Sequence, residues 1–194
     1  VGGRPVVAGC GWSCGGGGWG RGRGWGGGEG EVVGGRGRLL AVVGPLAWAA
    51  GRCGAILVMR DGVEGIGAER AARAFLATDL GFSGVVSVRP HLLADASRFR
   101  LRTVQRIHAL DSTGLETGLS SIVAPAPYAI AIAPGVAVPQ VMPAIREVTG
   151  TPVWGTGYIT TTEQANSVLA AGANVVSCAR PEVWREFSPV AVRD

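Results

Sequence analysis

The sequence predicts an α/β protein in which helices cover a parallel β-sheet. From about residue 54 onward, short apolar runs alternate with segments of helical periodicity, and this alternation is typical of parallel sheets. Most of the runs are apolar without interruption, as expected for strands that are buried on both faces. The chain has 194 residues and is 47% hydrophobic, so it is long enough for one such domain and too apolar for general disorder.

Six apolar runs are the strand candidates, and helices are expected between them. The strand candidates span residues 55–59, 84–88, 103–110, 129–133, 152–155 and 174–178. The helix candidates span residues 68–79, 91–100, 115–123, 140–148 and 160–172. Pro143 is expected to shorten or kink the fourth helix, and Thr160 with Glu163 predicts a capping box at the start of the fifth.

The first forty residues have a different composition. Eighteen of them are glycine, and five arginines against two glutamates give a net charge of +3. No hydrophobic period of a strand or helix is present, so we expect residues 1–38 to form a disordered arm and residues 39–194 to form the barrel-like domain. The arm would be a passive linker or an RNA-contacting tail. A third alternative is that the segment is not a selected protein sequence. Its commonest residues have GC-rich codons, so a wrong start site or reading frame in GC-rich DNA would give a similar composition.

The composition excludes several classes of protein. All 18 cationic residues are arginine, so enzymes that form a Schiff base through lysine are excluded. The four cysteines and two histidines have no common metal-ligand spacing, and no metal site is expected. Pro45 and Arg52 interrupt the apolar segment 39–59, so we expect buried structure there and no contact with a membrane. Reduced cysteines and the lack of a signal peptide predict a cytoplasmic protein.

The carboxyl ends of the last two strand candidates predict a phosphate site. Gly155 ends one strand candidate and Gly157 follows it, while Ser177 lies near the end of the next candidate. Glycine allows the backbone to approach an anion closely, and the amides at a helix N-terminus point toward it. Ligands of open α/β sheets and of barrels bind at this edge. The alternative is a turn with close packing, which also uses glycine.

Three stretches of the chain resemble one protein family. They are VQRIHALDSTGLETGL, the segment from APG through REVTGTPVWGTGYITTTEQANSVLAAGANVVSCA, and the closing EVWREF. In order and spacing they are similar to the glycerol 3-phosphate-responsive antiterminators, from about residue 54 to 187. The resemblance implies a TIM-barrel-like (β/α) fold. We expect this barrel to be incomplete at the N-terminus, because only residues 38–44 offer a further strand.

The resemblance also implies a function. The protein would sense glycerol 3-phosphate, bind a leader mRNA and regulate glycerol-utilisation genes by transcription antitermination. The role would be regulatory, with no catalytic residues and no cofactor besides the effector ligand. A homo-oligomer is compatible with this role.

The resemblance assigns the ligand site residue by residue. Gly157 and Ser177 would hold the phosphate through their amides, and Asp61 and Asp111 would accept hydrogen bonds from glycerol hydroxyls. Arg89 or Arg106 would balance the phosphate charge through bidentate contacts. With Gly155 from the same loop, the expected ligand-binding residues are Asp61, Ser87, Arg89, Arg106, Asp111, Gly135, Gly155, Gly157 and Ser177.

The chain departs from the family pattern at three positions close to the expected ligand. Thr156 stands where the family has the first of two glycines, and Thr160 stands where it commonly has arginine or lysine. Ala131 replaces an acidic residue in the strand before Pro134. The side chains around the expected site therefore differ from those of the family.

The densest group of positive charges comprises Arg98, Arg100, Arg102 and Arg106. The first three are candidates for RNA binding, because neutralising phosphates releases counterions. The alternative is a solvated helix end that a nearby aspartate partly balances. Arg106 lies within a strand candidate, where a charge needs a ligand or an acid as partner. His108 shares its face, and we expect a core histidine with a satisfied hydrogen bond there.

Two other functions remain open from the sequence. One is a phosphometabolite-binding barrel enzyme of the isomerase or lyase class, with Asp61 paired to Asp111 or Glu64 for acid–base chemistry. The other is a truncated barrel fragment without activity. A thermal-shift titration with glycerol 3-phosphate distinguishes a ligand-binding protein from such a fragment.

Overall fold

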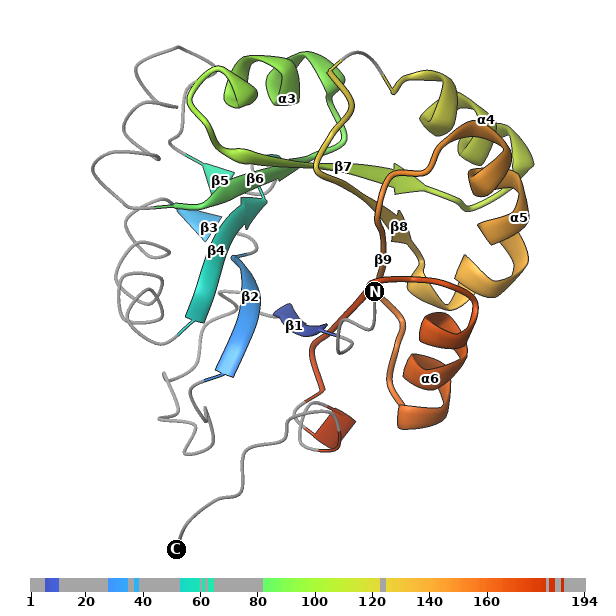
Figure 1. The fold of residues 1–194 in the computed structure, drawn as a ribbon. Coiled ribbons are helices and arrows are strands. Elements are labelled where there is room, and N and C mark those ends of the chain that lie inside the picture. Colours follow the sequence, from blue (N-terminus) through green and yellow to red (C-terminus); the bar gives the residue numbers. More distant parts are fainter. Residues whose placement is uncertain are drawn as a thin grey trace, which may run out of the picture.

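Eight parallel strands form a closed barrel in the part of the chain that the computed structural model describes. The described residues are 6–10, 28–34, 37–38, 53–59, 61, 63–64, 82–122, 125–180, 182–183 and 186. Their order around the barrel is β1-β10-β9-β8-β7-β6-β4-β2, and β2 pairs with β1 to close the ring. Figure 1 looks along the barrel from one end. The strands are β1 (Val6–Cys10), β2 (Gly28–Gly34), β4 (Cys53–Met59), β6 (Gly84–Ser87), β7 (Arg102–His108), β8 (Ala129–Ala133), β9 (Val153–Thr156) and β10 (Val175–Cys178).

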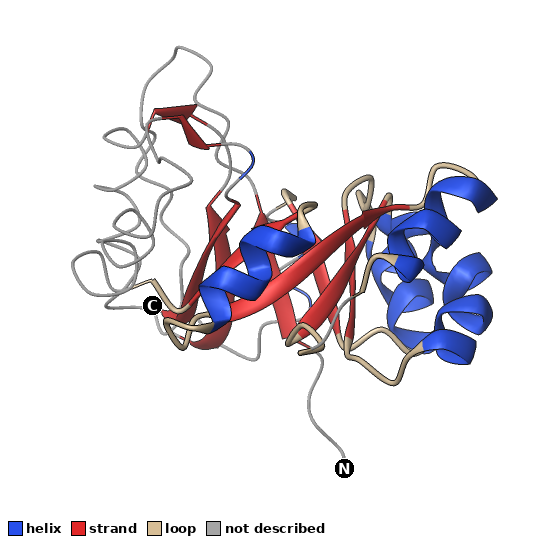
Figure 2. Cartoon of the chain, turned by 90° about the horizontal axis from the view of Figure 1, so that it is seen from above, coloured by secondary structure: helices blue, strands red, loops and turns tan. Residues whose placement is uncertain are grey.

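The helices of the described residues lie outside the barrel. In Figure 1 they follow one another around the ring, from α3 at the top through α4 and α5 to α6. Figure 2 shows the same arrangement from above, with the helices in blue outside the red strands. The helices are α3 (Pro90–Ser97), α4 (Ser112–Ser120), α5 (Val138–Val148) and α6 (Thr162–Ala170). The 3₁₀ helix η2 (Gly135–Ala137) precedes α5. Strand β3 (Gly37–Arg38) pairs with β5 (Val63–Glu64) in a separate small sheet.

The predicted barrel-like parallel sheet is confirmed. All six strand candidates form strands of the barrel, with bounds that agree within two residues, and β8 has the predicted bounds. These strands pair with parallel neighbours on both sides, so their uninterrupted apolar runs are explained by burial on both faces.

The N-terminal part of the fold differs from the prediction. β1 and β2 lie in the segment expected to be a disordered arm, and they complete the ring between β10 and β4. Ladder hydrogen bonds come from backbone groups, which glycine also carries, so short runs such as VVAGC are sufficient for a strand between two neighbours. The expected gap in the barrel is therefore closed. Residues 39–44 of the remaining strand candidate and the helix candidate 68–79 lie outside the described residues.

The helix boundaries depend on capping residues. α4 begins three residues earlier than predicted, because the Asp111 carboxylate accepts a hydrogen bond from the Gly114 amide at 2.7 Å and caps the first turn. α5 continues through Pro143 to Val148 and is not shortened there. The capping box of α6 uses Thr161 and Gln164, one residue later than the predicted pair.

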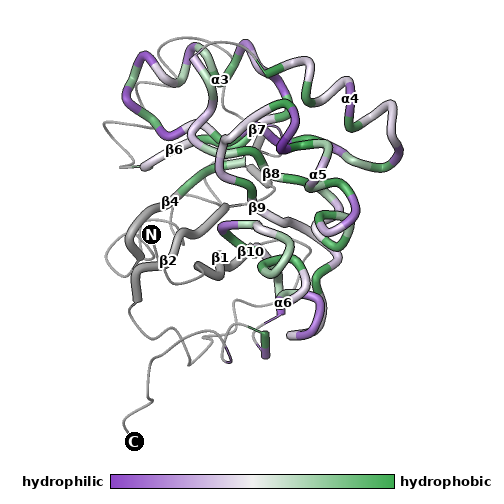
Figure 3. Tube along the Cα trace, turned by 45° about the vertical axis from the view of Figure 1, so that its right-hand side comes forward, coloured by the Kyte–Doolittle hydropathy of each residue, from purple (hydrophilic) through white to green (hydrophobic). Residues whose placement is uncertain are grey.

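Side chains alternate between the inside and the outside of the barrel. On β8, Ala129 and Ala131 face the interior, whereas Ile130 and Ile132 pack in the outer core beneath the helices. In Figure 3, β8 has hydrophobic colouring along its length, whereas hydrophilic colouring occurs on outer turns of the helices. The interior of the barrel is filled by Leu57, Val86, Val104, Ala129, Ala131, Trp154 and Val175.

Candidate functional site

The interior of the barrel opens toward the carboxyl ends of its strands in a small hollow. Its cavity volume is about 10 Å³, so the hollow is shallow and open to solvent. It contains no carboxylate among the described residues, and its polar side chains come from three different strands. We call it the barrel hollow; its lining is Met59, Val86, Arg106, Ala131, Trp154, Thr156 and Ser177.

Arg106 brings a positive charge into the barrel hollow. Its Nη1 atom lies 3.4 Å from the sulfur of Met59, and its Nε atom is buried without a hydrogen-bond partner. The residue opposite it on β8 is Ala131, so the neighbouring strand supplies no acidic partner at this position. A partly buried guanidinium with an unused donor favours an anionic ligand.

Ser177 places a second unused polar atom in the same hollow. The residue is 2% exposed, and its hydroxyl oxygen has no hydrogen-bond partner. Thr156, on the neighbouring strand β9, pairs with Ser177 in register and adds another hydroxyl to the lining. Buried hydroxyls nearly always have a partner in native proteins, so these groups indicate a site built for a polar ligand.

The glycines of the expected phosphate loops have structural roles. The Gly157 amide donates to the carbonyl of Ser177 at 3.4 Å, and the Gly135 amide donates to the carbonyl of Gly157 at 2.9 Å. Both amides are therefore engaged in joining adjacent loops. Gly157 has a φ of +83°, which favours glycine. A β-carbon at Gly155 would lie 2.5 Å from Val168 of α6, so this glycine faces the helix layer.

A second cluster joins three of the expected residues at the ends of β4 and β6. The Ser87 hydroxyl donates to Asp61 Oδ1 at 3.0 Å, and the Val88 amide donates to Asp61 Oδ2 at 2.7 Å. The guanidinium Nε of Arg89 lies 3.8 Å from the same carboxylate. Asp61, Ser87 and Arg89 thus form one network, separate from the lining of the barrel hollow.

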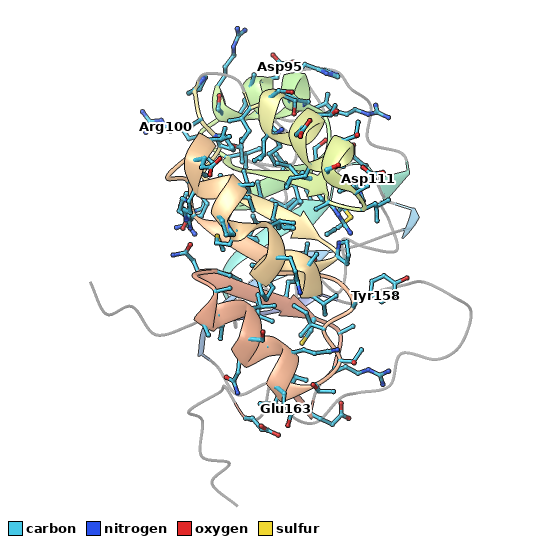
Figure 4. All side chains as sticks on the ribbon, turned by 90° about the vertical axis from the view of Figure 1, so that its right-hand side faces the viewer. Asp95, Arg100, Asp111, Tyr158 and Glu163 are labelled. Atoms are coloured by element: carbon cyan, nitrogen blue, oxygen red, sulfur yellow. The ribbon has the colours of Figure 1, made fainter. Side chains whose placement is uncertain are left out.

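Asp111 lies at the rim with its carboxylate committed to the cap of α4. Figure 4 shows it at the same end of the barrel as Tyr158. Tyr158 is 81% exposed and has a φ of +60°, which is uncommon for a residue with a side chain. No residue pattern indicated this tyrosine, because its exposure at the rim depends on the conformation of the loop that Gly157 begins.

His108 lies one step closer to solvent than Arg106 on the same face of β7. Burial lowers the pKa of this imidazole and the charge of Arg106 lowers it further, whereas the negative charge of Asp61 opposes them. The residue is exposed, so the expectation of a core histidine is wrong. Its place was predictable from the strand period, but its exposure depends on where β7 ends.

Three of the predicted arginines lie away from the barrel hollow. Arg98 and Arg100 follow α3, and Arg102 is the first residue of β7. All three are exposed. They are therefore at the amino ends of the strands, while Arg106 is the member of the group that faces the interior.

A family model for the glycerol-3-phosphate responsive antiterminators matches residues 41–184. The chain belongs to this antiterminator family. Its membership agrees with the closed parallel barrel and with the polar hollow at the carboxyl ends of the strands.

Solved structures resemble this antiterminator over most of its length. A glycerol uptake operon antiterminator regulatory protein from Listeria monocytogenes is 25% identical, with a TM-score of 0.71 over 81% of this chain and 83% of that one. An antiterminator-related protein from Thermotoga maritima is 24% identical, with a TM-score of 0.70 over 80% and 87%. Orotidine 5′-phosphate decarboxylase from Pyrococcus horikoshii, at 13% identity and a TM-score of 0.56 over 81% and 84%, shares the fold alone.

No curated protein sequence matches this antiterminator. In the described residues, no helix has the length and apolar character needed to cross a membrane. The same residues contain no group of three or more histidine, cysteine or acidic side chains arranged to hold a metal ion.

Proposed function

We propose that this antiterminator binds glycerol 3-phosphate in the barrel hollow and, in response, binds the leader mRNA of glycerol-utilisation genes. One observation carries the proposal for the ligand. Arg106 Nε and Ser177 Oγ are buried without partners in the same hollow. Family membership supports the choice of glycerol 3-phosphate among phosphate esters.

The chemistry of the hollow suits a phosphate group. A phosphate dianion needs a positive charge and several hydrogen-bond donors, which Arg106 and the hydroxyls of Ser177 and Thr156 supply. The remaining lining is apolar, so these contacts are partly shielded from water and strengthened. The ligand would complete the hydrogen bonding that the hollow leaves unsatisfied.

The glycerol end of the ligand would point toward the rim. Each carboxylate oxygen of Asp61 already accepts one hydrogen bond and retains capacity for another, which a hydroxyl of the ligand can use. Ser87 and Arg89 hold this carboxylate in place. Asp111, Gly135, Gly155 and Gly157 would shape the rim through caps, turns and close packing.

Binding would serve regulation without catalysis. The chain contains no lysine for covalent chemistry, and the described residues that line the hollow include no carboxylate or imidazole to act as a general base. The protein would need no cofactor besides its effector and would act in the cytoplasm, where its transcript is made.

A thermal-shift titration tests the ligand. Glycerol 3-phosphate should raise the melting temperature in a concentration-dependent manner, since a ligand at about 100 times its Kd adds about 2.7 kcal/mol. Glycerol and inorganic phosphate are the matched controls and should act only at much higher concentration. The absence of any shift at millimolar glycerol 3-phosphate would overturn the proposal.

Filter binding tests the response. The probe is the leader transcript of a glycerol-utilisation operon from the same genome, measured with and without glycerol 3-phosphate. Tighter binding with the effector is expected, and Ser177→Ala should abolish that difference while leaving the basal RNA affinity unchanged. Equal binding in both conditions would exclude the switch.

A further inference from the structure

We propose that an exposed cluster at the opposite end of the barrel from the hollow binds single-stranded RNA. The cluster is Arg98, Arg100, Arg102 and Tyr128, which we call the arginine–tyrosine patch. The inference rests on the proposed function, because it assigns a surface to the RNA that the function requires. It adds that effector and RNA occupy opposite ends of the barrel.

The members of the patch lie at the amino end of the barrel, close in sequence to the starts of β7 and β8. Arg98 and Arg100 lie in the turn between α3 and β7, Arg102 is the first residue of β7, and Tyr128 directly precedes β8. β7 and β8 are hydrogen-bonded neighbours, so Arg102 and Tyr128 lie side by side. Figure 4 shows Arg100 at the end of the barrel opposite to Asp111 and Tyr158.

The patch combines positive charge with an exposed aromatic ring. All three arginines are exposed, and Tyr128 is 48% exposed. The guanidinium carbon of Arg102 lies 5.0 Å from the centre of the Tyr128 ring, a cation–π contact that orients both groups. Between Asp95 and Asp111 the chain has no acidic residue, so the net charge of this turn and strand is positive.

Arg100 has a backbone conformation that favours another residue type. Its φ is +58°, in the left-handed region that glycine and asparagine adopt more easily. The chain nevertheless has arginine at this exposed position. An unfavourable backbone conformation retained at the surface is typical of functional sites, and here it accompanies a charge that a nucleic acid can use.

The chemistry of the patch favours RNA with unpaired bases. Arginine binds phosphates through paired donors, and an exposed tyrosine stacks on a base that is not already stacked in a helix. An acidic protein would engage the arginines but would have no use for stacking on the tyrosine.

Fluorescence polarisation of the full chain tests the patch. The probe is a labelled single-stranded RNA of mixed sequence, measured with and without glycerol 3-phosphate, and the duplex of the same sequence is the competitor. Arg98→Ser and Arg100→Gly should each weaken binding several-fold and lower the salt dependence by about one unit of slope. Arg180→Ser, which removes an exposed arginine outside the patch, is the matched control and should bind like the wild type.

Substitutions of Tyr128 provide a second, chemically distinct test of the patch. Tyr128→Leu should weaken binding by roughly tenfold, whereas Tyr128→Phe, which keeps the ring, should bind nearly as well as the wild type. Arg100→Gly removes a strained side chain, so its melting temperature should equal or exceed that of the wild type. Loss of RNA binding in this variant then cannot be attributed to unfolding.

The outcomes separate the patch from the proposed function. If the wild type binds RNA and the patch variants bind equally well, the surface assignment is wrong and the proposed function stands. If the wild type binds neither this RNA nor the leader transcript, with or without effector, both are overturned. Equal competition by the duplex, or a change of oligomeric state in the variants without a change in RNA affinity, would also refute the assignment to single-stranded RNA.

Discussion

Arg106 occupies an inward position of β7, where barrels normally place an apolar branched side chain. Its register neighbour on β8 is Ala131, and its nearest partner in the described residues is the sulfur of Met59. A guanidinium with an unused buried donor destabilises the ligand-free protein. The same unused donor can bind an anion that enters the hollow. Such a loss of stability at a functional site is common in proteins.

Arg106→Met should therefore stabilise the ligand-free protein and abolish its response to glycerol 3-phosphate. Removal of the unsatisfied donor should raise the free energy of unfolding by about 1 kcal/mol, measured by urea denaturation. Thermal shift with the effector gives the second readout. Arg180→Met is the control and should retain the ligand response. A variant that still responds to glycerol 3-phosphate would contradict the placement of the phosphate.

The histidine at the mouth predicts a pH dependence of stability. Burial and the charge of Arg106 lower the pKa of His108 in the folded state, so the unfolded chain takes up the proton first as the pH falls. The free energy of unfolding therefore falls as the pH drops through the ordinary pKa of histidine, about 6.5. Urea midpoints at about pH 7.5 and about pH 5.5 should differ more for the wild type than for His108→Gln. Equal differences would refute this effect.

At the scale of elements, contacts between a strand and its helix depend on single glycines. Gly155→Ala should destabilise the protein by about 1–3 kcal/mol, because the added β-carbon would meet Val168 of α6 at 2.5 Å. Gly150→Ala is the matched control: nothing lies within 4 Å of its added carbon, so a change within about 0.5 kcal/mol is expected. Urea unfolding of both variants checks the difference. Equal stability would show that α6 can shift without cost.

The elements that the sequence predicts well are those buried on both sides. The apolar run of β8 has the predicted bounds, because the exposed Tyr128 precedes it and Pro134 follows it. The helix starts were less predictable. α4 and α6 begin where Asp111 and Thr161 cap them, and several nearby threonines and serines offered equally good caps in the sequence.

The candidate site was only partly predictable. Arg106 and Ser177 follow from the strand period and from the family resemblance, and the structure brings both to the barrel hollow. The roles of Gly135 and Gly157 were not predictable, because a glycine that frees an amide for a ligand has the same sequence signal as one whose amide joins two loops. Met59 and Trp154 line the hollow, but apolar residues within a strand give no sign of which face they occupy around a ring.

At the scale of the whole molecule, closure of the barrel depends on β1 and β2. These strands join β10 to β4, and without them both would be open edges of a parallel sheet. Glycine-rich composition concealed them, because hydrophobic periodicity detects side chains and not the backbone groups that pair. Closure also sets the geometry of the hollow, since β4 and β10 contribute Met59 and Ser177 to its lining.

Deletion of residues 1–34, which removes β1 and β2, should therefore cause aggregation and loss of cooperative thermal unfolding. Light scattering and circular dichroism measure the two effects. Deletion of residues 1–5, which leaves both strands in place, is the control and should behave like the full chain. If the larger deletion stays monodisperse with an unchanged melting temperature, these residues form a dispensable arm.

The methyl groups on the inner side of β8 have a consequence for evolution. Ala131 forms part of the wall of the hollow, while β8 is held by backbone pairing with β7 and β9. One substitution at this alanine can narrow the chamber or add a charge to it, and the neighbouring strands need not be rebuilt. Members of a lineage can thus diverge in the metabolite they accept while the architecture that encloses it stays the same.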